Sequence, residues 1–305
     1  MTESYGWIVY NGNLVTEKFK DYVDWFQEAA KAQNILVEGK ANNQLLAYIK
    51  DGKPELAGSD ERLPDFVHYA DKDLHLARHL ELMGIPLFNT SRAIELCDNK
   101  ALMHQYLANK GITTPDTIIA PKIFGGLPIE DESHIKLAAG ELGLPLIIKE
   151  AYGSFGQQVY WVNTIEELFS LSKKLQGKEY VFQKPVMESL GNDIRLNVIG
   201  DKVVAAMKRT SATDFRANVT AGGKTLPYTP TEEEIELAVF SAKAVGAHFA
   251  GVDLLQGENG PLLCEINSNP HLRSIYECTG IDVATDMIQF IKENIHRKGR
   301  PLNEF

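Results

Sequence analysis

Short apolar runs alternate with segments of helical spacing over the first 90 residues of the chain. In 19–32, apolar residues recur at the spacing of one helix face, and 73–83 repeats this pattern up to a terminating Gly84. Runs of β-prone residues surround these helices, at 6–10, 35–37, 45–49, 64–68 and 85–88. Strands that alternate with helices predict an α/β layer with a mostly parallel sheet.

Beyond this region, capping residues indicate where further helices begin. Ser91, Asn99, Thr164 and Thr231 are each suited to an N-cap, and Glu167 lies where it would complete a capping box with Thr164. Helices are predicted at 91–96, 100–109, 133–142, 164–175, 231–245 and 283–295, and strands at 116–119, 145–150 and 180–183, with a hairpin at 194–207. A chain of 305 residues is too long for one small core and suits two or three compact units.

A second hairpin, predicted at 251–270, carries the most informative polar residues. Its two apolar runs flank the turn sequence 257–260, and a three-residue loop would place Asp253 directly opposite Glu265. Asn267 shares the face of Glu265, because side chains alternate along a strand. Adjacent buried carboxylates are costly unless a cation neutralises them, and hard oxygen ligands suit Mg²⁺. The alternative for the hairpin alone is a polar face in contact with solvent.

Two further stretches favour a bound phosphate. Lys149 ends an apolar strand beside the loop 151–159, whose glycines and serine could turn backbone N–H groups toward phosphates. Taken alone, such a loop is most often a simple turn between strands, and the adjacent Lys149 is what favours a phosphate site. Arg195, Arg209 and Arg216 are concentrated in a short stretch of an acidic protein, either as anion ligands or as a basic strand edge that resists aggregation.

Composition narrows the classes of function. The formal net charge of −10 and the lack of a basic stripe argue against a nucleic-acid-binding protein. We find no long apolar run and no secretory signal, so we expect a cytoplasmic protein without a membrane partner. Cys97, Cys264 and Cys278 lack metal-binding spacing and are expected to be reduced thiols.

In their order, these segments resemble the ATP-grasp superfamily, and within it the RimK-type (ribosomal-protein glutamate ligase) carboxylate–amine ligases. The matching stretches are 98–100, 145–149, 153–156, 183–186, 191–195, 214–218, 251–253, 265–267 and 279–284. The resemblance is good from about residue 90 to the C-terminus and weak before it. It implies an α/β N-terminal domain at 1–97, then two α+β ATP-grasp subdomains at 98–186 and 187–305, which carry the Gly-rich loop and the metal site and hold ATP between them.

The resemblance also implies roles for individual residues. ATP would be bound by Lys100, Lys149, Gly153, Ser154, Phe155, Gly156, Gln183, Lys184, Val186, Asp193, Arg216 and Asn218. Among these, Lys149, Arg216 and Asn218 would also act in catalysis, 183–186 would recognise adenine, and Asp193 would accept the ribose hydroxyls. Pro185 has no N–H but is compatible with this hinge, which uses the carbonyl of Lys184 and the N–H of Val186. Asp253, Glu265 and Asn267 would be the ligands of Mg²⁺, with Mn²⁺ as the alternative ion.

The implied reaction is ATP-dependent and ADP-forming. A carboxylate of a small molecule, peptide or protein would become an acyl phosphate and then form an amide with an amine such as the amino acid glutamate. Glutamate-adding relatives tend to have Ser-Pro-Gly and an acidic residue where this chain has 268–274, so the added amino acid stays open. We expect Arg195, Arg209 and Arg273 to face the substrate, whereas His271 either contacts it or, as is more common for a histidine in a loop, faces water. Alternatives are a dipeptide or peptide-tailoring ATP-grasp ligase and a non-catalytic nucleotide-binding module; a homo-oligomer is compatible with each.

Overall fold

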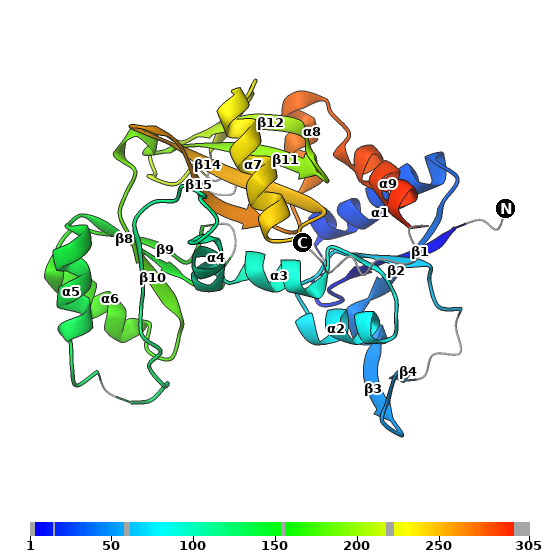
Figure 1. Ribbon diagram of the computed structural model, residues 1–305, viewed down its shortest axis with the longest axis horizontal. Helices are drawn as coiled ribbons and strands as arrows, with labels where there is room; N and C mark the ends of the chain where they lie inside the picture. The colour runs from blue at the N-terminus through cyan, green and yellow to red at the C-terminus, as the bar shows by residue number, and fades with distance from the viewer. Residues whose placement is uncertain are drawn as a thin grey trace.

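The computed structural model describes residues 4–14, 16–57, 62–127, 129–153, 156–217 and 223–295. Three larger sheets follow one another along the chain (Figure 1). Each gathers strands from one of the predicted units 1–97, 98–186 and 187–305, whose boundaries stay predictions. The mixed helix and strand content agrees with the predicted α/β class. No helix within the described ranges is long and apolar enough to cross a membrane.

The first sheet has the strand order β2-β1-β5-β6 and only parallel pairings, as predicted. Its strands are β1 (Tyr5–Tyr10), β2 (Leu36–Ala41), β5 (Phe66–Tyr69) and β6 (Leu87–Phe88). The connecting helices are α1 (Glu17–Ala32), between β1 and β2, and α2 (Leu74–Leu82), between β5 and β6. Because the strands are parallel, their carboxyl ends lie at one edge, where open α/β sheets usually bind ligands.

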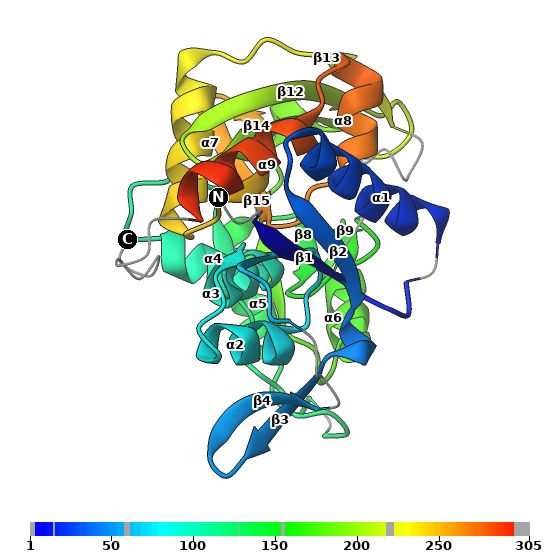
Figure 2. The ribbon, with the colours of Figure 1, turned by 90° about the vertical axis from the view of Figure 1, so that its right-hand side faces the viewer.

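A hairpin projects from this first unit, away from the rest of the molecule (Figure 2). It consists of β3 (Leu46–Lys50) and β4 (Lys53–Ala57), paired antiparallel. The first strand corresponds to the β-prone run predicted at 45–49, whereas β4 was not predicted. The Asp51-Gly52-Lys53-Pro54 sequence is typical of a turn, but the turn is confined to Asp51 and Gly52, and β4 begins at Lys53.

The middle sheet is antiparallel, with the order β7-β10-β8-β9. It contains β7 (Thr117–Ile119), β8 (Leu146–Glu150), β9 (Val159–Val162) and β10 (Tyr180–Gln183), and packs with α5 (Ser133–Leu142) and α6 (Ile165–Lys174) around one core. Two short helices, α3 (Ser91–Asp98) and α4 (Lys100–Leu107), bridge the first and second sheets (Figure 1). The bridge places the first residue of α4, Lys100, beside the middle sheet.

The third sheet is antiparallel, with the order β13-β12-β11-β14-β15. Its strands are β11 (Asn192–Ile199), β12 (Lys202–Thr210), β13 (Lys224–Pro227), β14 (Phe249–Gly257) and β15 (Gly260–Asn267). The helices that follow or separate them are α7 (Glu232–Ala244), α8 (Leu272–Thr279) and α9 (Val283–Asn294).

The two faces of this sheet differ in polarity because side chains alternate along each strand. Ile194, Leu196 and Val252 point to the face that is covered by α7. The opposite face is apolar where it packs on α1, α8 and α9, through residues such as Met207 and Phe249. Farther along, this second face carries the acidic and basic residues of the site.

Local details differ from the sequence predictions at several helix ends. The N-cap of α3 is Thr90, whose Oγ1 accepts a hydrogen bond from the Ala93 N–H at 3.2 Å, rather than Ser91. Glu167 accepts from the N–H of Asn163, one residue before Thr164, so the predicted reciprocal box does not close. Helix α8 was not predicted, because it begins at Leu272 without a side-chain cap bond from the preceding residue.

Candidate active site

Two cavities meet between the sheets. The smaller, of about 110 Å³, lies between the middle and third sheets, and the larger, of about 690 Å³, lies between the first and third sheets. Lys100, Gly153 and Glu265 line both. The two spaces therefore adjoin at Lys100 and Glu265, whose Nζ and Oε2 atoms are 3.9 Å apart.

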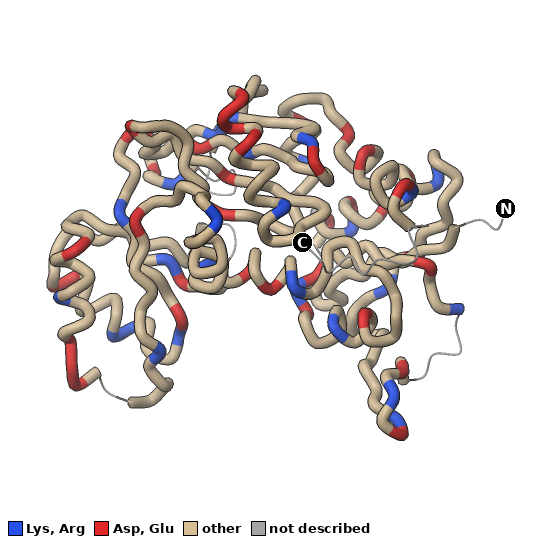
Figure 3. Tube along the Cα trace, in the orientation of Figure 1, with Lys and Arg blue, Asp and Glu red and all other residues tan. Residues whose placement is uncertain are grey.

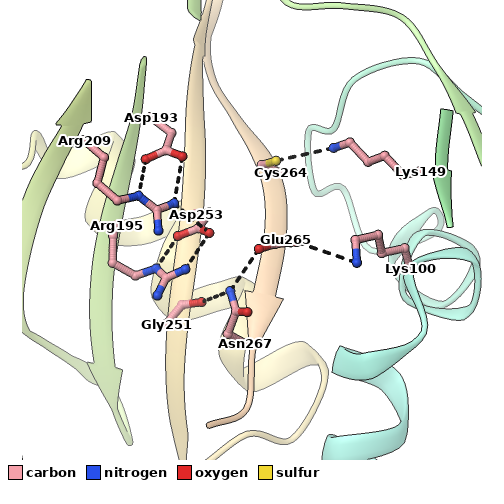
Figure 4. Close-up of polar contacts among 10 residues, drawn as sticks. All are labelled: Lys100, Lys149, Asp193, Arg195, Arg209, Gly251, Asp253, Cys264, Glu265 and Asn267. Carbon is pink, nitrogen blue, oxygen red and sulfur yellow. Dashed lines mark hydrogen bonds and ion pairs between the residues drawn. The ribbon is translucent and has the colours of Figure 1, made fainter. Parts of the chain in front are cut away.

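The two predicted phosphate-binding lysines reach this junction from different elements. Lys100, at the start of α4, also donates to the Gly153 carbonyl at 3.3 Å. Lys149, on β8, donates to Cys264 Sγ at 3.6 Å (Figure 4). Both side chains are buried, at 9% and 7% residue exposure. Two buried ammonium groups that line the same cavity attract an anion strongly.

The hairpin β14–β15 pairs Asp253 with Glu265, as predicted. The route to that register differs from the prediction. The loop has two residues, Glu258 and Asn259, and an irregularity between Asp253 and Leu254 makes Cys264 the extra residue of a bulge. The bulge restores the register that a three-residue loop would have produced, and it turns the consecutive residues Cys264 and Glu265 toward the same cavity.

Four charged side chains form a network on β11, β12 and β14, in which Arg209 and Asp253 are buried and Asp193 and Arg195 are partly exposed (Figure 4). Arg195 donates through Nε and Nη2 to both carboxylate oxygens of Asp253, with Nη2–Oδ2 at 2.7 Å. Arg209 donates to both oxygens of Asp193 and approaches Asp253 Oδ2 at 2.9 Å. Burial raises the pKa of Asp253, but the two guanidinium groups outweigh this and hold its pKa below the usual value. Asp253 is therefore a carboxylate that is already paired with two guanidinium groups, those of Arg195 and Arg209.

Glu265 and Asn267 are the more accessible members of the predicted metal set. Asn267 donates through Nδ2 to the Gly251 carbonyl at 3.2 Å and to Glu265 Oε1 at 3.3 Å. Using Nδ2 in this way orients the amide and leaves its Oδ1 as the acceptor. Gly251 has no side chain, and this matters here because a Cβ would come within 3.2 Å of Arg195 Cδ and 2.9 Å of Pro270 Cβ.

The predicted adenine hinge lines the smaller cavity through Gln183, Lys184 and Val186. The Gln183 amide donates to Thr117 Oγ1 at 2.8 Å and lies 3.3 Å from Nε2 of His104, a residue the sequence analysis did not single out. His104 is one helical turn from Lys100, and this spacing is the signal that could have found it. Burial and the nearby Lys149 and Lys100 lower the pKa of His104 to about 4, so its imidazole is neutral.

Arg216 connects the third sheet to the Gly-rich loop. It donates to both oxygens of Asp214, with Nη2–Oδ2 at 2.7 Å, and through Nη1 to the carbonyls of Gly156 and Val159. Asp214 thus fixes the guanidinium at the cavity wall. Ser154, Phe155 and Asn218, which were predicted to contact ATP, lie outside the described residues.

Two of the predicted substrate residues lie on the far wall of the larger cavity. His271 precedes α8, and its ring centroid lies 5.6 Å from that of Phe19 on α1. Arg273 donates to both carboxylate oxygens of Asp21 and lies over the Trp25 ring, with its guanidinium carbon 4.5 Å from the centroid. Arg273 therefore ties α8 to α1, a role the sequence did not indicate.

Asn89, which the sequence analysis missed, fixes the first unit to the hairpin of the site. Its Nδ2 donates to the carbonyls of Phe249 and Ser268 at 2.8 and 2.7 Å. Its Oδ1 accepts from the N–H groups of His248 and Phe249. Asn89 follows β6 directly, and an amide at a strand end is too common a feature to have revealed this contact.

Charges of both signs are interspersed along all three units (Figure 3). The basic residues of the site therefore do not form a patch along the chain. Lys100 and Lys149 differ from the other lysines because they are buried and line the smaller cavity.

The three sheets, with paired lysines facing a carboxylate hairpin, define an ATP-dependent ligase that forms carbon–nitrogen bonds between a carboxylate and an amine. The chain belongs to the RimK-like ATP-grasp family, whose model matches residues 97–291. A "Probable alpha-L-glutamate ligase" of Picosynechococcus sp. is 38% identical over 227 residues, which are 72% of this chain and 71% of that protein.

Solved structures agree on the fold. A RimK domain ATP-grasp protein from Sphaerobacter thermophilus superposes with a TM-score of 0.71 over 94% of this chain and 99% of its own, at 18% identity. The ATP-grasp ligase PsnB, complexed with minimal precursor, Mg and ADP, gives 0.69 over 96% and 98%, at 16% identity. The fold class and the resemblance stated from the sequence are thereby confirmed.

Proposed function

We propose that this ligase converts a substrate carboxylate to an acyl phosphate and transfers the acyl group to the amine of an amino acid or peptide. In the first step, a carboxylate oxygen attacks the γ-phosphorus of ATP while the bond to ADP breaks. In the second, the amine nitrogen attacks the acyl carbon, the carbon–oxygen bond to phosphate breaks, and the amine proton passes to phosphate or water. Catalysis would rest on positioning and electrostatics.

The observation that carries this proposal is the junction of the two cavities. Lys100 and Lys149 face Glu265 and Cys264 across the gap between the middle and third sheets. A nucleotide in the smaller cavity would present its terminal phosphate at Lys100, beside the larger cavity where a carboxylate can approach. We assign phosphate binding to both lysines, and to Arg216 as a further cation held by Asp214.

The donor set on β14 and β15 fits Mg²⁺. Glu265 and Asn267 lie two residues apart on one strand face, and both supply the hard oxygens that Mg²⁺ prefers. Asp253 lies opposite, and its Oδ1, which accepts only from Arg195 Nε among the described residues, retains acceptor capacity for a cation, whereas Oδ2 is approached by both guanidinium groups. Bound Mg²⁺ would neutralise phosphate charge during transfer. We keep Asp253, Glu265 and Asn267 as the proposed ligands, with Mn²⁺ as the alternative ion.

Nucleotide binding would require some opening of the structure. The smaller cavity, at about 110 Å³, is below the roughly 300 Å³ that small-molecule sites usually offer. The contact of Arg216 with the Gly156 carbonyl holds its two walls together. We propose that ATP enters when this contact opens, with adenine at 183–186 and the ribose near Asp193, whose oxygens already accept from Arg209.

Amino acids or peptides are the substrates that the relatives support. The Picosynechococcus protein is named as a glutamate ligase, and PsnB was solved with a precursor. The test is to incubate the protein with ATP, Mg²⁺ and pairs of carboxylates and amino acids, and to follow ADP and product mass. We expect a product equal to the two substrates minus water.

Isotope labelling tests the intermediate. With an ¹⁸O-labelled carboxylate, an acyl phosphate requires that label appears in the released phosphate. Formation of AMP in place of ADP, or product without label in phosphate, would contradict the mechanism. Repeating the assay with Mn²⁺ in place of Mg²⁺ tests the alternative ion.

A further inference from the structure

The larger cavity is built partly from the first unit, which lies outside the region matched by the family model. Its walls include Asn11 and Asp71, which follow the parallel strands β1 and β5, together with Phe19 of α1. The carboxyl edge of the first sheet thus faces the hairpin β14–β15. Side chains at this edge can contact a substrate whose reacting group lies at Glu265.

The basic residues around this cavity already have acidic partners. Each lysine or arginine that lines it in the described ranges forms an ion pair: Lys72 with Asp98, Lys100 with Glu265, Arg195 with Asp253, Arg209 with Asp193 and Asp253, and Arg273 with Asp21. The positive charges on the cavity walls are therefore already neutralised by carboxylates of the protein itself.

Asp71 is the buried carboxylate of these walls that has no such partner among the described residues. It is 7% exposed, and no lysine or arginine of the described residues lies within ion-pair distance of its carboxylate. Oδ1 accepts from the Lys72 backbone N–H at 2.8 Å and from Asn11 Nδ2 at 3.3 Å, which fixes the orientation of the group. Lys72, the next residue, acts on this carboxylate through its charge but forms its ion pair with Asp98, so the hydrogen bonds to Asp71 come from neutral donors. The carboxylate therefore retains acceptor capacity for a direct cationic partner.

A second unfilled acceptor lies next to it. Asn269 donates through Nδ2 to the Asp71 backbone carbonyl at 3.2 Å, while its Oδ1 is buried and accepts no hydrogen bond within the described part of the chain. Asn269 also lines the larger cavity and is two residues from Asn267. One carboxylate without a direct ion pair among the described residues, together with one unfilled amide oxygen, suits an ammonium group, which has three donors and no acceptor.

We propose that Asp71, supported by Asn11 and Asn269, binds the ammonium group of a substrate amino acid in the larger cavity. This inference rests on the proposed ligase function, because it places the ammonium beside the segment that carries Asn267. The ammonium belongs either to the molecule whose carboxylate is activated or to the incoming amine before it loses its proton. Asp71 is thus a specificity-determining residue contributed by the first unit.

The test measures binding, so it does not depend on turnover. Glycine, L-alanine, L-leucine, L-glutamate and L-lysine are titrated into the protein with ADP and Mg²⁺, each beside its N-acetyl derivative, which lacks the ammonium, and its amide, which lacks the carboxylate. We expect at least one free amino acid to bind ten-fold or more tightly than its N-acetyl form. If the amide of that amino acid also binds, the carboxylate is not needed, and the ammonium group at Asp71 belongs to the amine substrate. If the amide does not bind, the ammonium group belongs to the amino acid whose carboxylate is activated.

Asp71→Asn should lower the affinity for that amino acid at least ten-fold and remove the preference over the N-acetyl form, while ADP affinity is unchanged. Glu277→Gln is the matched control, since Glu277 is an exposed carboxylate that lines the same cavity. An intact preference in Asp71→Asn, or a wild-type protein that binds none of the amino acids, overturns the inference. Binding without ADP release from any substrate pair would instead contradict the proposed function.

Discussion

The Nζ atom of Lys100 lies 3.9 Å from Oε2 of Glu265, and this pair stands where the two cavities of the molecule meet. Lys100 begins α4, on the bridge between the first and second sheets, whereas Glu265 lies on β15 of the third. The pair therefore depends on all three units being in place. It also joins a proposed phosphate ligand to a proposed metal ligand at the point where phosphoryl transfer would occur.

Removing the charge of Glu265 tests the metal site directly. Glu265→Gln keeps the size of the side chain, so we expect the fold to be retained and Mg²⁺-dependent ADP release to fall by roughly 100-fold or more, as expected when a group that stabilises transition-state charge is lost. The measurement is ADP release as a function of Mg²⁺ concentration. Glu258→Gln, in the exposed turn of the same hairpin, is the control and should behave like wild type. Near-normal turnover by Glu265→Gln would rule out the assignment.

Lys149 provides a test that separates nucleotide binding from chemistry. Hydrogen bonds to charged groups contribute about 1.5–3 kcal/mol. Lys149→Ala should therefore weaken ADP and ATP-analogue binding by roughly 10- to 100-fold, measured by calorimetry. Lys174→Ala, on the exposed side of α6, removes a lysine far from the cavity and should leave affinity unchanged. Equal affinities for the two variants would contradict the phosphate role.

Much of this site could be predicted from local patterns, because strand periodicity places Glu265 and Asn267 on one face and the hairpin places Asp253 opposite Glu265. The bulge at Cys264 could not be predicted. The apolar and polar residues over 262–266 are compatible both with a two-residue loop followed by a bulge and with a three-residue loop without one. The pairing of Asp253 with Glu265 was therefore predicted correctly from an incorrect loop. The result is a cysteine at the smaller cavity, where strict alternation would have directed it to the opposite face.

Long-range contacts account for the other differences. Nothing near Arg273 in sequence indicates Asp21, which is 252 residues away, and the sequence-based expectation of substrate contact ignored this partner. The same holds for Asp71 and Asn89, whose neighbours come from the third unit. Both residues follow parallel strands, so the rule that ligands bind at the carboxyl edge of such sheets could have drawn attention to them.

Asn89 should contribute strongly to stability, because its buried amide satisfies four backbone groups at the junction of the first and third sheets. Asn89→Ala leaves these groups without a partner, and each unsatisfied group costs about 1–3 kcal/mol. We expect a loss of several kcal/mol in the free energy of unfolding, measured with urea. Asn13→Ala, an exposed asparagine in the loop after β1, is the control. A loss below 1 kcal/mol would show that water replaces the amide.

Buried histidines should make the protein less stable as pH falls. Burial lowers the pKa of His248 to about 4, and its Nδ1 has no hydrogen-bond partner among the described residues. Below pH about 6.5 the unfolded state binds a proton that the folded state excludes, so stability decreases from there to pH 4. His248→Phe retains an aromatic ring between Phe88 and Phe290 and removes this proton uptake. When the pH is lowered from 7.5 to 5.5, the unfolding free energy of wild type should fall by about 1 kcal/mol more than that of His248→Phe, measured by urea unfolding at each pH. His75→Gln, at an exposed position on α2, should show no such gain, and parallel pH profiles for wild type and His248→Phe would contradict the prediction.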